Sequence, residues 1–428
     1  MNSFARSLAI VCATLILPVT GSAQDTAAMR LDVGAQATWV ATRESPAIGG
    51  RALTEGYLTQ PVLMTTLGLW NDALSLRNTL DFEGATIRRG ELNAGIFGEG
   101  YIDRRHPHTY VHELTATAEH SFAGTAVSLT AGKGFAPFGT DDPMSRPFEK
   151  YPINHHLAQI PERAIAIAAL RSGSLVLDGG LFNGDEPESP GDTPNKNRYW
   201  DSWSARATFL PISQAELQAS YARVKSPENA TGGGADQRKH SASIRLEDAQ
   251  HSGYALLEWA HTREYLGATT TIAYTSVLAE TWTRYGKLNG GLRLESTERP
   301  DEDRLLDPFR TPVPPTDPGF IGRSHWTIIT ARLAGGFNLG RFGLEPFTEL
   351  AGMHVSETLK PSGFDPRAFY GSNRIWSISV GAKLSFGMHH MRMGRYGAAI
   401  TDGMRAPRSG GGMPGMNMME TPRPFPAD

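Results

Sequence analysis

The most regular stretch of the chain runs from Trp376 to Phe386, where apolar and polar positions alternate without a break. The apolar even positions are Trp376, Ile378, Val380, Ala382, Leu384 and Phe386. Strict alternation is the period of a β-strand with one apolar face. A tilted strand of about ten residues crosses the apolar band of an outer membrane, and aromatic residues favour the two edges of that band.

Similar but weaker patterns recur along the chain and predict fifteen further strands. The predicted strands cover residues 31–39, 60–70, 74–82, 109–120, 125–134, 163–171, 174–183, 203–209, 217–221, 239–247, 252–263, 269–281, 287–296, 324–334 and 343–355. Pro346 weakens the prediction for the last of these, because proline cannot donate to a strand ladder. With 376–386 the chain has sixteen predicted strands.

The connections between these strands alternate in length, as they do in outer-membrane barrels with short periplasmic turns and longer external loops. The short connections are 71–72, 121–124, 172–173, 211–213, 248–250, 282–286 and 335–341. The longer ones are 43–59, 84–108, 135–162, 184–200, 225–238, 264–268, 297–323 and 356–373. Reading 92–102 as part of a loop preserves this alternation. We therefore predict an all-β, antiparallel, up-and-down transmembrane barrel spanning residues 24–386.

The N-terminus predicts export. Arg6 supplies a positive charge, Leu8 to Val19 form a short apolar run, and Ala23 ends a stretch of small residues. These are the parts of a signal peptide, here residues 1–23, cleaved before Gln24. The single cysteine of the chain, Cys12, lies inside this segment, so the mature protein has no thiol for catalysis, disulfides or metal binding.

Composition agrees with a barrel once the strand period is known. The mean hydropathy is −0.31, which suggests a soluble protein until the apolar half of each strand is counted separately. The net charge of −3 provides no field that would attract nucleic acid. No cofactor is required by any motif in the chain.

Together these patterns resemble the bacterial outer-membrane porins and porin-like channels. The stretch 134–139, Gly-Phe-Ala-Pro-Phe-Gly, resembles phosphate-selective porin-like proteins, and we infer no substrate from it. The resemblance implies a Gram-negative outer membrane, contact with its lipid, passage of small hydrophilic solutes and a homotrimer as an assembly to test. It also implies that the last strand is an assembly signal read by the barrel-assembly machinery, carried by Trp376, Ile378, Val380, Leu384 and Phe386. Porin chains usually end at such an aromatic residue, whereas this chain continues to Asp428.

The same resemblance implies that the third external loop, 135–162, folds into the lumen and narrows the pore. Its candidate constriction residues are Asp141, Asp142, Arg146, Glu149, Lys150, His155, His156 and Glu162, with Arg163 at the exit. Opposed acids and bases across a wet opening filter solutes by charge and size. The alternative is that these residues only solvate an external loop. The candidate lumen wall, which has mixed charge, comprises Arg77, Asp81, Arg206, Glu216, Arg245, Glu247, Arg293, Glu295 and Lys383.

Two segments could bind metal. The first contains His106, His108, His112 and Glu113, although alternation places the last two on opposite faces of a strand. The second is the Met-, Gly- and Pro-rich tail, 387–428, which we expect to be disordered and periplasmic. Thioether and imidazole donors in that tail suit Cu(I). The candidate ligands there are Met388, His389, His390, Met391 and Met393.

No enzyme motif is present, so we expect the protein not to be an enzyme. A hydrolase built from a serine and His112 or His120 at the rim would need a contact that the sequence does not reveal. The favoured interpretation is a passive channel for small hydrophilic solutes. The alternatives are a plugged barrel that handles copper-type metal ions through its His-rich loops and Met-rich tail, and a secreted all-β binding protein.

Overall fold

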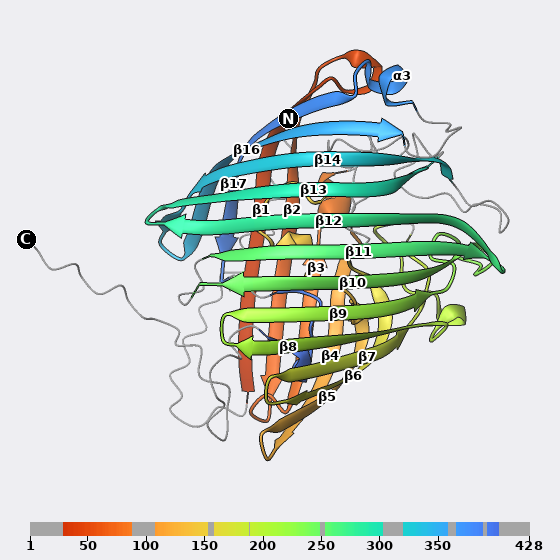
Figure 1. Ribbon diagram of the computed structural model, residues 1–428. Helices are drawn as coiled ribbons and strands as arrows, with labels where there is room; N and C mark the ends of the chain where they lie inside the picture. The colour runs from red at the N-terminus through yellow and green to blue at the C-terminus, as the bar shows by residue number, and fades with distance from the viewer. Residues whose placement is uncertain are drawn as a thin grey trace, which may run out of the picture.

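The chain forms a closed antiparallel β-barrel in the computed structural model, which describes residues 29–87, 108–152, 158–187, 189–248, 253–302, 320–357, 365–387 and 392–401 (Figure 1). Consecutive strands pair along the sheet, and β1 (Met29–Ser45) closes it by pairing with β17 (Arg374–Phe386). The prediction of a sixteen-stranded barrel is confirmed. The expected signal peptide lies outside the described residues.

The remaining strands lie where the alternation predicts them, although most have different ends and several are longer. They are β2 (Leu53–Leu69), β3 (Leu74–Asp81), β4 (Val111–Phe122), β5 (Thr125–Gly134), β6 (Arg163–Ser172), β7 (Leu175–Phe182), β8 (Ser202–Ile212), β9 (Ala215–Val224), β10 (Asp236–Glu247), β11 (Tyr254–Leu266), β12 (Thr269–Tyr285), β13 (Leu288–Glu302), β14 (Phe320–Gly335), β15 (Phe337–Leu339) and β16 (Phe342–Glu357). Short helices occur in the connections: η1 (Ile48–Gly50), α2 (Glu83–Thr86), η2 (Pro143–Ser145), η4 (Lys196–Arg198), α3 (Pro366–Tyr370) and η5 (Gly397–Ala399).

One strand, β15, is not predicted by the sequence pattern. It is a short hairpin arm that pairs only with the start of β16, within the connection 335–341. Pro346 follows at the point where β16 changes its partner from β15 to β14, since Leu344 pairs with Phe337 and Phe347 with Ala334. The missing N–H of this proline therefore costs the sheet no ladder bond on that side.

The connections keep the predicted alternation with one exception. The predicted external loop 264–268 is only a two-residue turn, because β11 extends to Leu266 and β12 begins at Thr269. Gly267 occupies the left-handed region there, with a φ of 62°. The connection between β1 and β2 lies at one end of the barrel. Apart from the turn at 267–268, the connections at that end are longer than those at the other end.

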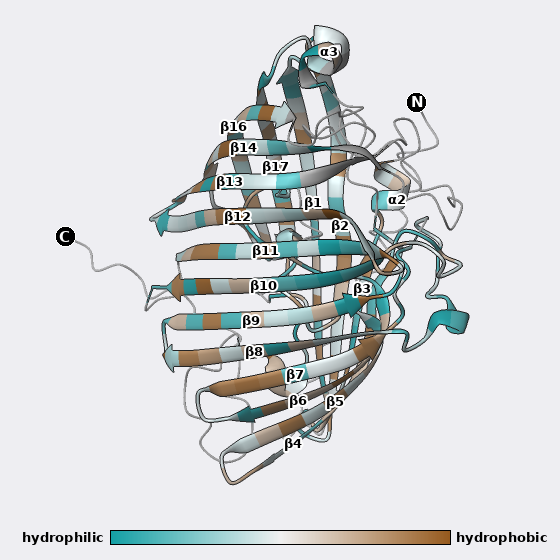
Figure 2. Cartoon of the chain, turned by 45° about the vertical axis from the view of Figure 1, so that its right-hand side comes forward, coloured by the Kyte–Doolittle hydropathy of each residue, from teal (hydrophilic) through white to brown (hydrophobic). Residues whose placement is uncertain are grey.

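The outer face of the barrel is apolar. In β8 the outward positions Trp203, Ala205, Ala207 and Phe209 alternate with buried Ser204, Arg206 and Thr208. Figure 2 shows hydrophobic colour along β5 to β7 and a hydrophilic edge where the longer connections gather. A closed sheet with apolar side chains outside and hydrogen-bonded polar groups inside satisfies the requirements of a membrane-spanning barrel. No helix in the described ranges is long and apolar enough to cross a membrane.

The proposed assembly-signal residues share the outer face of the closing strand. Trp376, Val380 and Leu384 are 43–47% exposed, and Phe386 contacts Phe342 at 5.5 Å between ring centroids. β17 pairs with β1 from Ser45 opposite Trp376 to Ala35 opposite Phe386. The last strand of the barrel is therefore the strand whose pairing closes it.

A charge in the middle of this outer face should destabilise the barrel. We expect Val380→Arg to lower the free energy of unfolding in lipid vesicles by about 2–4 kcal/mol, because the guanidinium would lie in hydrocarbon. Tyr285→Arg is the control, since Tyr285 is 87% exposed at the end of β12 and should tolerate arginine. Urea-driven equilibrium unfolding followed by tryptophan fluorescence measures both; equal effects would contradict the assignment of Val380 to the lipid face.

Candidate lumenal site

The connection 135–162, between β5 and β6, crosses the interior of the barrel. Its Thr140 and Arg146 donate to Glu258 of β11 at 2.5 and 3.2 Å. The backbone N–H groups of Glu149 and Lys150 donate to Glu349 of β16 at 2.9 and 3.1 Å. Both partners lie on strands far from β5 in the barrel order. The loop is thus attached to the wall across the lumen from its own ends on β5 and β6.

Apolar side chains of the same loop pack inside the barrel instead of facing the external solvent. Phe138, Met144 and Tyr151 are at most 3% exposed and join one apolar cluster with Ile165 of β6. Phe148 lies under the guanidinium of Arg293, 4.3 Å from its ring centroid. These contacts make the loop part of the packed interior.

The candidate constriction residues within the described ranges are all buried, at most 7% exposed. They are Asp141, Asp142, Arg146, Glu149, Lys150, Glu162 and Arg163. His155 and His156 lie outside the described residues. The charged groups pair directly with neighbours, as Arg146 does with Glu258 and Arg163 with Glu186 at 3.1 Å.

Asp141 belongs to a network that continues beyond the loop. Its carboxylate lies 3.8 Å from Arg146, 3.9 Å from Arg245 of β10 and 3.8 Å from Arg392. Burial opposes ionisation of Asp141, but the three guanidinium groups outweigh it, so the pKa of this carboxyl is lowered. Asp141 therefore carries its negative charge at neutral pH.

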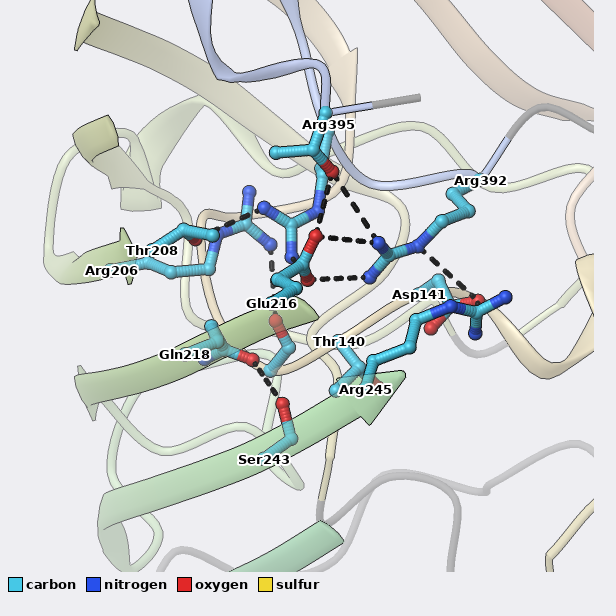
Figure 3. A network of polar contacts seen from close by, with 12 residues as sticks. Thr140, Asp141, Arg206, Thr208, Glu216, Gln218, Ser243, Arg245, Arg392 and Arg395 are labelled. Carbon is cyan, nitrogen blue, oxygen red and sulfur yellow. Dashed lines mark hydrogen bonds and ion pairs between the residues drawn. The ribbon is translucent and has the colours of Figure 1, made fainter. Parts of the chain in front are cut away.

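A segment of the C-terminal tail, residues 392–401, lies inside the barrel beside this loop (Figure 3). Glu216 of β9 accepts from both terminal nitrogens of Arg392, at 2.8 and 2.9 Å, and from Arg395 at 2.8 Å. Thr401 donates to the same carboxylate at 2.9 Å. Charge-assisted, bidentate contacts of this kind fix both position and orientation.

The backbone of the segment is held as firmly as its side chains. Arg206 of β8 donates to the carbonyl of Gly394 at 3.0 Å. Gly397 has a φ of 48°, and a Cβ there would lie 2.4 Å from the hydroxyl of Ser128. The hydroxyl of Tyr396 accepts from the N–H of Phe135 at 2.9 Å, which joins the tail to the start of the crossing loop.

Within the tail that the sequence predicts to be disordered, the structure describes residues 392–401 inside the barrel. Arg392 and Arg395 pair there with Glu216 of the wall, and Gly397 lies against Ser128 of β5. Met393, a candidate metal ligand, is 5% exposed within the apolar cluster of Phe135 and Tyr396. The other candidates in the tail, Met388, His389, His390 and Met391, lie outside the described residues.

Burial also affects the tail arginines. The pKa of Arg395 is lowered to about 10, first because it is buried and then because Arg206 and Arg392 lie near, against the opposing effect of Glu216. Arg395 still carries a positive charge at pH 7, so its contact with Glu216 is an ion pair.

The charged residues predicted for the lumen wall lie on inward positions of their strands. Several are paired within the wall, as Arg206 is with Asp178 at 2.6 Å and Arg293 with Glu280 at 2.6 Å. Others contact the loop or the tail: Arg293 donates to the carbonyl of Lys150 and Arg77 to that of Arg395. The remaining predicted wall residues are Asp81, Glu216, Arg245, Glu247, Glu295 and Lys383.

A second polar cluster lies where β3 ends and β4 begins. His112 contacts Glu162 at 2.8 Å and Asp142 at 3.4 Å through its two ring nitrogens. Glu162, whose φ is 60°, also accepts from the N–H of Thr109 at 2.8 Å. The second and third external loops therefore meet inside the barrel.

The electrostatics of this cluster favour ionised acids. Burial opposes ionisation of Glu162, but its hydrogen bond with His112 and the attraction of His112, His108 and Lys133 lower its pKa to about 2. Asp142 behaves in the same way: burial opposes its ionisation, and contact with His112 lowers its pKa.

The prediction that His112 and Glu113 face opposite sides is wrong. Both are at most 1% exposed. The register between β3 and β4 shifts here, with Thr79 opposite Glu113 but Leu80 opposite Val111, so His112 is an extra residue. Such a β-bulge turns a side chain that alternation would direct outward.

Several site residues were not predicted from the sequence. Glu83, Glu258 and Glu349 contact loop residues that are distant from them in the sequence, so no local pattern indicates these contacts. Arg392 and Arg395 have no distinguishing signal in the sequence, because the tail also contains Arg405 and Arg408 at the same spacing.

The fold defines the class of the protein as a closed antiparallel β-barrel with a paired polar interior. No protein-family model and no curated protein matches the chain in sequence. Among solved structures, a loop L8 deletion mutant of OmpT, an outer membrane protein of Vibrio cholerae, has a TM-score of 0.49 at 9% identity, covering 84% of this chain and all of that one. An anion-selective porin from Comamonas acidovorans has a TM-score of 0.47 at 12% identity, covering 84% of this chain and 100% of that chain. OccK3 (OpdO) of Pseudomonas aeruginosa has a TM-score of 0.38 at 11% identity, covering 83% and 95%.

Removing the charge of Glu216 should release the tail segment. We expect Glu216→Gln to increase the rate of trypsin cleavage after Arg392 and Arg395 about tenfold or more, because a buried guanidinium pair would lose its counter-charge. Limited proteolysis of the folded protein followed by mass spectrometry measures the rate. Glu345→Gln is a matched control on β16, where the acid pairs with Arg332 at 3.1 Å. Unchanged cleavage in Glu216→Gln would show that the ion pairs do not hold the segment.

Proposed function

We propose that this protein is an outer-membrane channel for passive diffusion of small hydrophilic solutes, narrowed by the inward-folded loop 135–162. The observation that carries the proposal is the attachment of this loop, across the lumen from its ends on β5 and β6, to Glu258 of β11 and Glu349 of β16. A loop that is held at both ends and in its middle divides the lumen but leaves part of it open. Solutes then pass only through the polar space beside it.

The groups beside the loop suit polar solutes of either charge. Acidic and basic side chains alternate along the proposed solute path, where Asp141 contacts both Arg245 and Arg392. Paired charges of mixed sign create strong local fields without a net preference for anions or cations. We therefore propose selection mainly by size and polarity, with no catalytic step.

The tail segment is a second obstruction in this proposal. It occupies the space between β4 to β9 and the loop, so the channel conducts weakly while Arg392 and Arg395 are paired with Glu216. Displacement of the segment would widen the path without any change in the wall.

Export and membrane insertion complete the proposal. We propose cleavage of residues 1–23, recognition of the closing strand that ends at Phe386 by the barrel-assembly machinery, residence in the Gram-negative outer membrane and assembly as a homotrimer. The outward position of Trp376, Ile378, Val380 and Leu384 supports recognition from the lipid side.

Release of the tail should increase conductance. We expect the double variant Arg392→Ala/Arg395→Ala to show single-channel conductance roughly twofold or more above that of the unaltered protein in planar bilayers, because the obstruction is no longer anchored. Arg341→Ala, at an exposed turn, is the control and should leave conductance unchanged. If neither the unaltered protein nor the double variant shows stepwise conductance, although both are correctly folded, the channel proposal is contradicted.

The crossing loop should govern selectivity. Glu258→Gln removes the acid that holds Arg146 and Thr140, so we expect a shift in reversal potential toward anions in a salt gradient. Asp72→Asn, an acid-to-amide change in the turn between β2 and β3, where Asp72 pairs with Arg30 at 2.9 Å, serves as the control. Identical reversal potentials in the two variants would contradict the role of the loop.

A further inference from the structure

The clearest unexplained group inside the barrel is the trio Asp81, Glu83 and His108. Asp81 is the last residue of β3, Glu83 the first of α2, and His108 precedes β4. They are 0%, 0% and 5% exposed. One ligand atom of each lies within 4.8 Å of the others. Two buried carboxylates and an imidazole directed at one point are unusual unless something positive lies between them.

The contacts of the two carboxylates separate their oxygens into two kinds. Asp81 accepts from the N–H of Glu83 at 2.8 Å through Oδ1. Its Oδ2 is buried, has no hydrogen-bond partner and lies 3.6 Å from Nδ1 of His108. Glu83 uses Oε1 to accept from the Thr59 hydroxyl at 2.8 Å and the Gln60 N–H at 2.9 Å. Its Oε2 lies 3.2 Å from the same imidazole nitrogen.

Each carboxylate is therefore oriented by one oxygen and directs the other toward His108. This is how outer contacts position metal-ligating acids. Gln60 supports the arrangement from an unusual backbone conformation, with a φ of 51°. The His108 ring is also fixed by the edge of His112, 4.6 Å away between centroids.

The spacing of the donor atoms fits a small divalent ion. Ligand atoms about 2.0–2.2 Å from a tetrahedral Zn²⁺ lie roughly 3.3–3.6 Å from one another. The oxygens of Glu83 and Asp81 lie 3.2 and 3.6 Å from His108 Nδ1, which is close to this range. Three protein ligands leave a further position for water.

From this geometry we propose that Asp81, Glu83 and His108 form a binding site for a divalent transition-metal ion of the Zn²⁺ or Mn²⁺ kind. Imidazole and carboxylate donors suit these ions, whereas Cu(I) prefers the thioethers that the site lacks. The ion would join the end of β3 to α2 and to the start of β4. Through His112 and Glu162 this junction also contacts the crossing loop.

The test is metal binding to the metal-stripped full-length protein in detergent. ZnCl₂ and MnCl₂ are titrated separately by calorimetry, and Co²⁺ is used for its absorption spectrum. We expect about one ion per chain, and a loss of affinity of about 100-fold or more in Asp81→Asn, Glu83→Gln and His108→Ala. Thr59→Val, which removes one of the two hydrogen bonds to Oε1 of Glu83, should weaken binding about tenfold.

Two controls make the result specific. His120→Ala removes an outward imidazole of β4 and should leave binding unchanged. Alanine at Met388, His389, His390 and Met391 should also leave it unchanged. The proposal is overturned if folded Asp81→Asn and Glu83→Gln bind as the unaltered protein does, if only the tail variant loses binding, or if no Zn²⁺ or Mn²⁺ binds at all. Conductance plays no part in this readout, so its outcome is separate from that of the channel proposal.

Discussion

Each inward carboxylate or guanidinium covered by the loop or the tail loses its water, and it must then meet an opposite charge. An unpaired buried charge costs several kcal/mol, whereas a paired one is roughly neutral for stability. Glu216 illustrates the constraint: it faces two arginines of the tail and a hydroxyl, and all of these contacts come from a segment nearly two hundred residues away in the chain. The need to pair buried charges therefore determines where the crossing loop and the tail segment lie, more than apolar packing does.

The same constraint explains why the crossing loop has one arrangement. Its backbone N–H groups near Glu149 have no strand partner, and the carboxylate of Glu349 supplies one. The acids of the loop contact arginines of the wall. The positions of these arginines along the strands are fixed because the strand register is fixed. A shift of the loop by one residue would separate several of these pairs at once. The loop is therefore specified by the wall, although it is not part of the sheet.

The sequence predicts the barrel well because strand alternation is a local property. Eleven alternating residues at 376–386 suffice to assign β17, and the same period places the other spanning strands. The bulge at His112 breaks the period by a single residue, and its cause lies across the sheet at Thr79. Glu83 lies in a short helix whose partners, Thr59 and His108, are about 25 residues away on either side. Contacts of that kind depend on tertiary structure, so no local pattern reveals them.

Ion pairs and apolar contacts contribute differently to the docking of the tail segment. Arg392, Arg395 and Glu216 would all be hydrated if the segment left the lumen, so their pairing contributes little net free energy to docking. The apolar contacts of Met393 and Tyr396 with Phe135 must supply most of the remainder. The ion pairs with Glu216 therefore give the docking of the segment its specificity, whereas the apolar cluster contributes most of its strength.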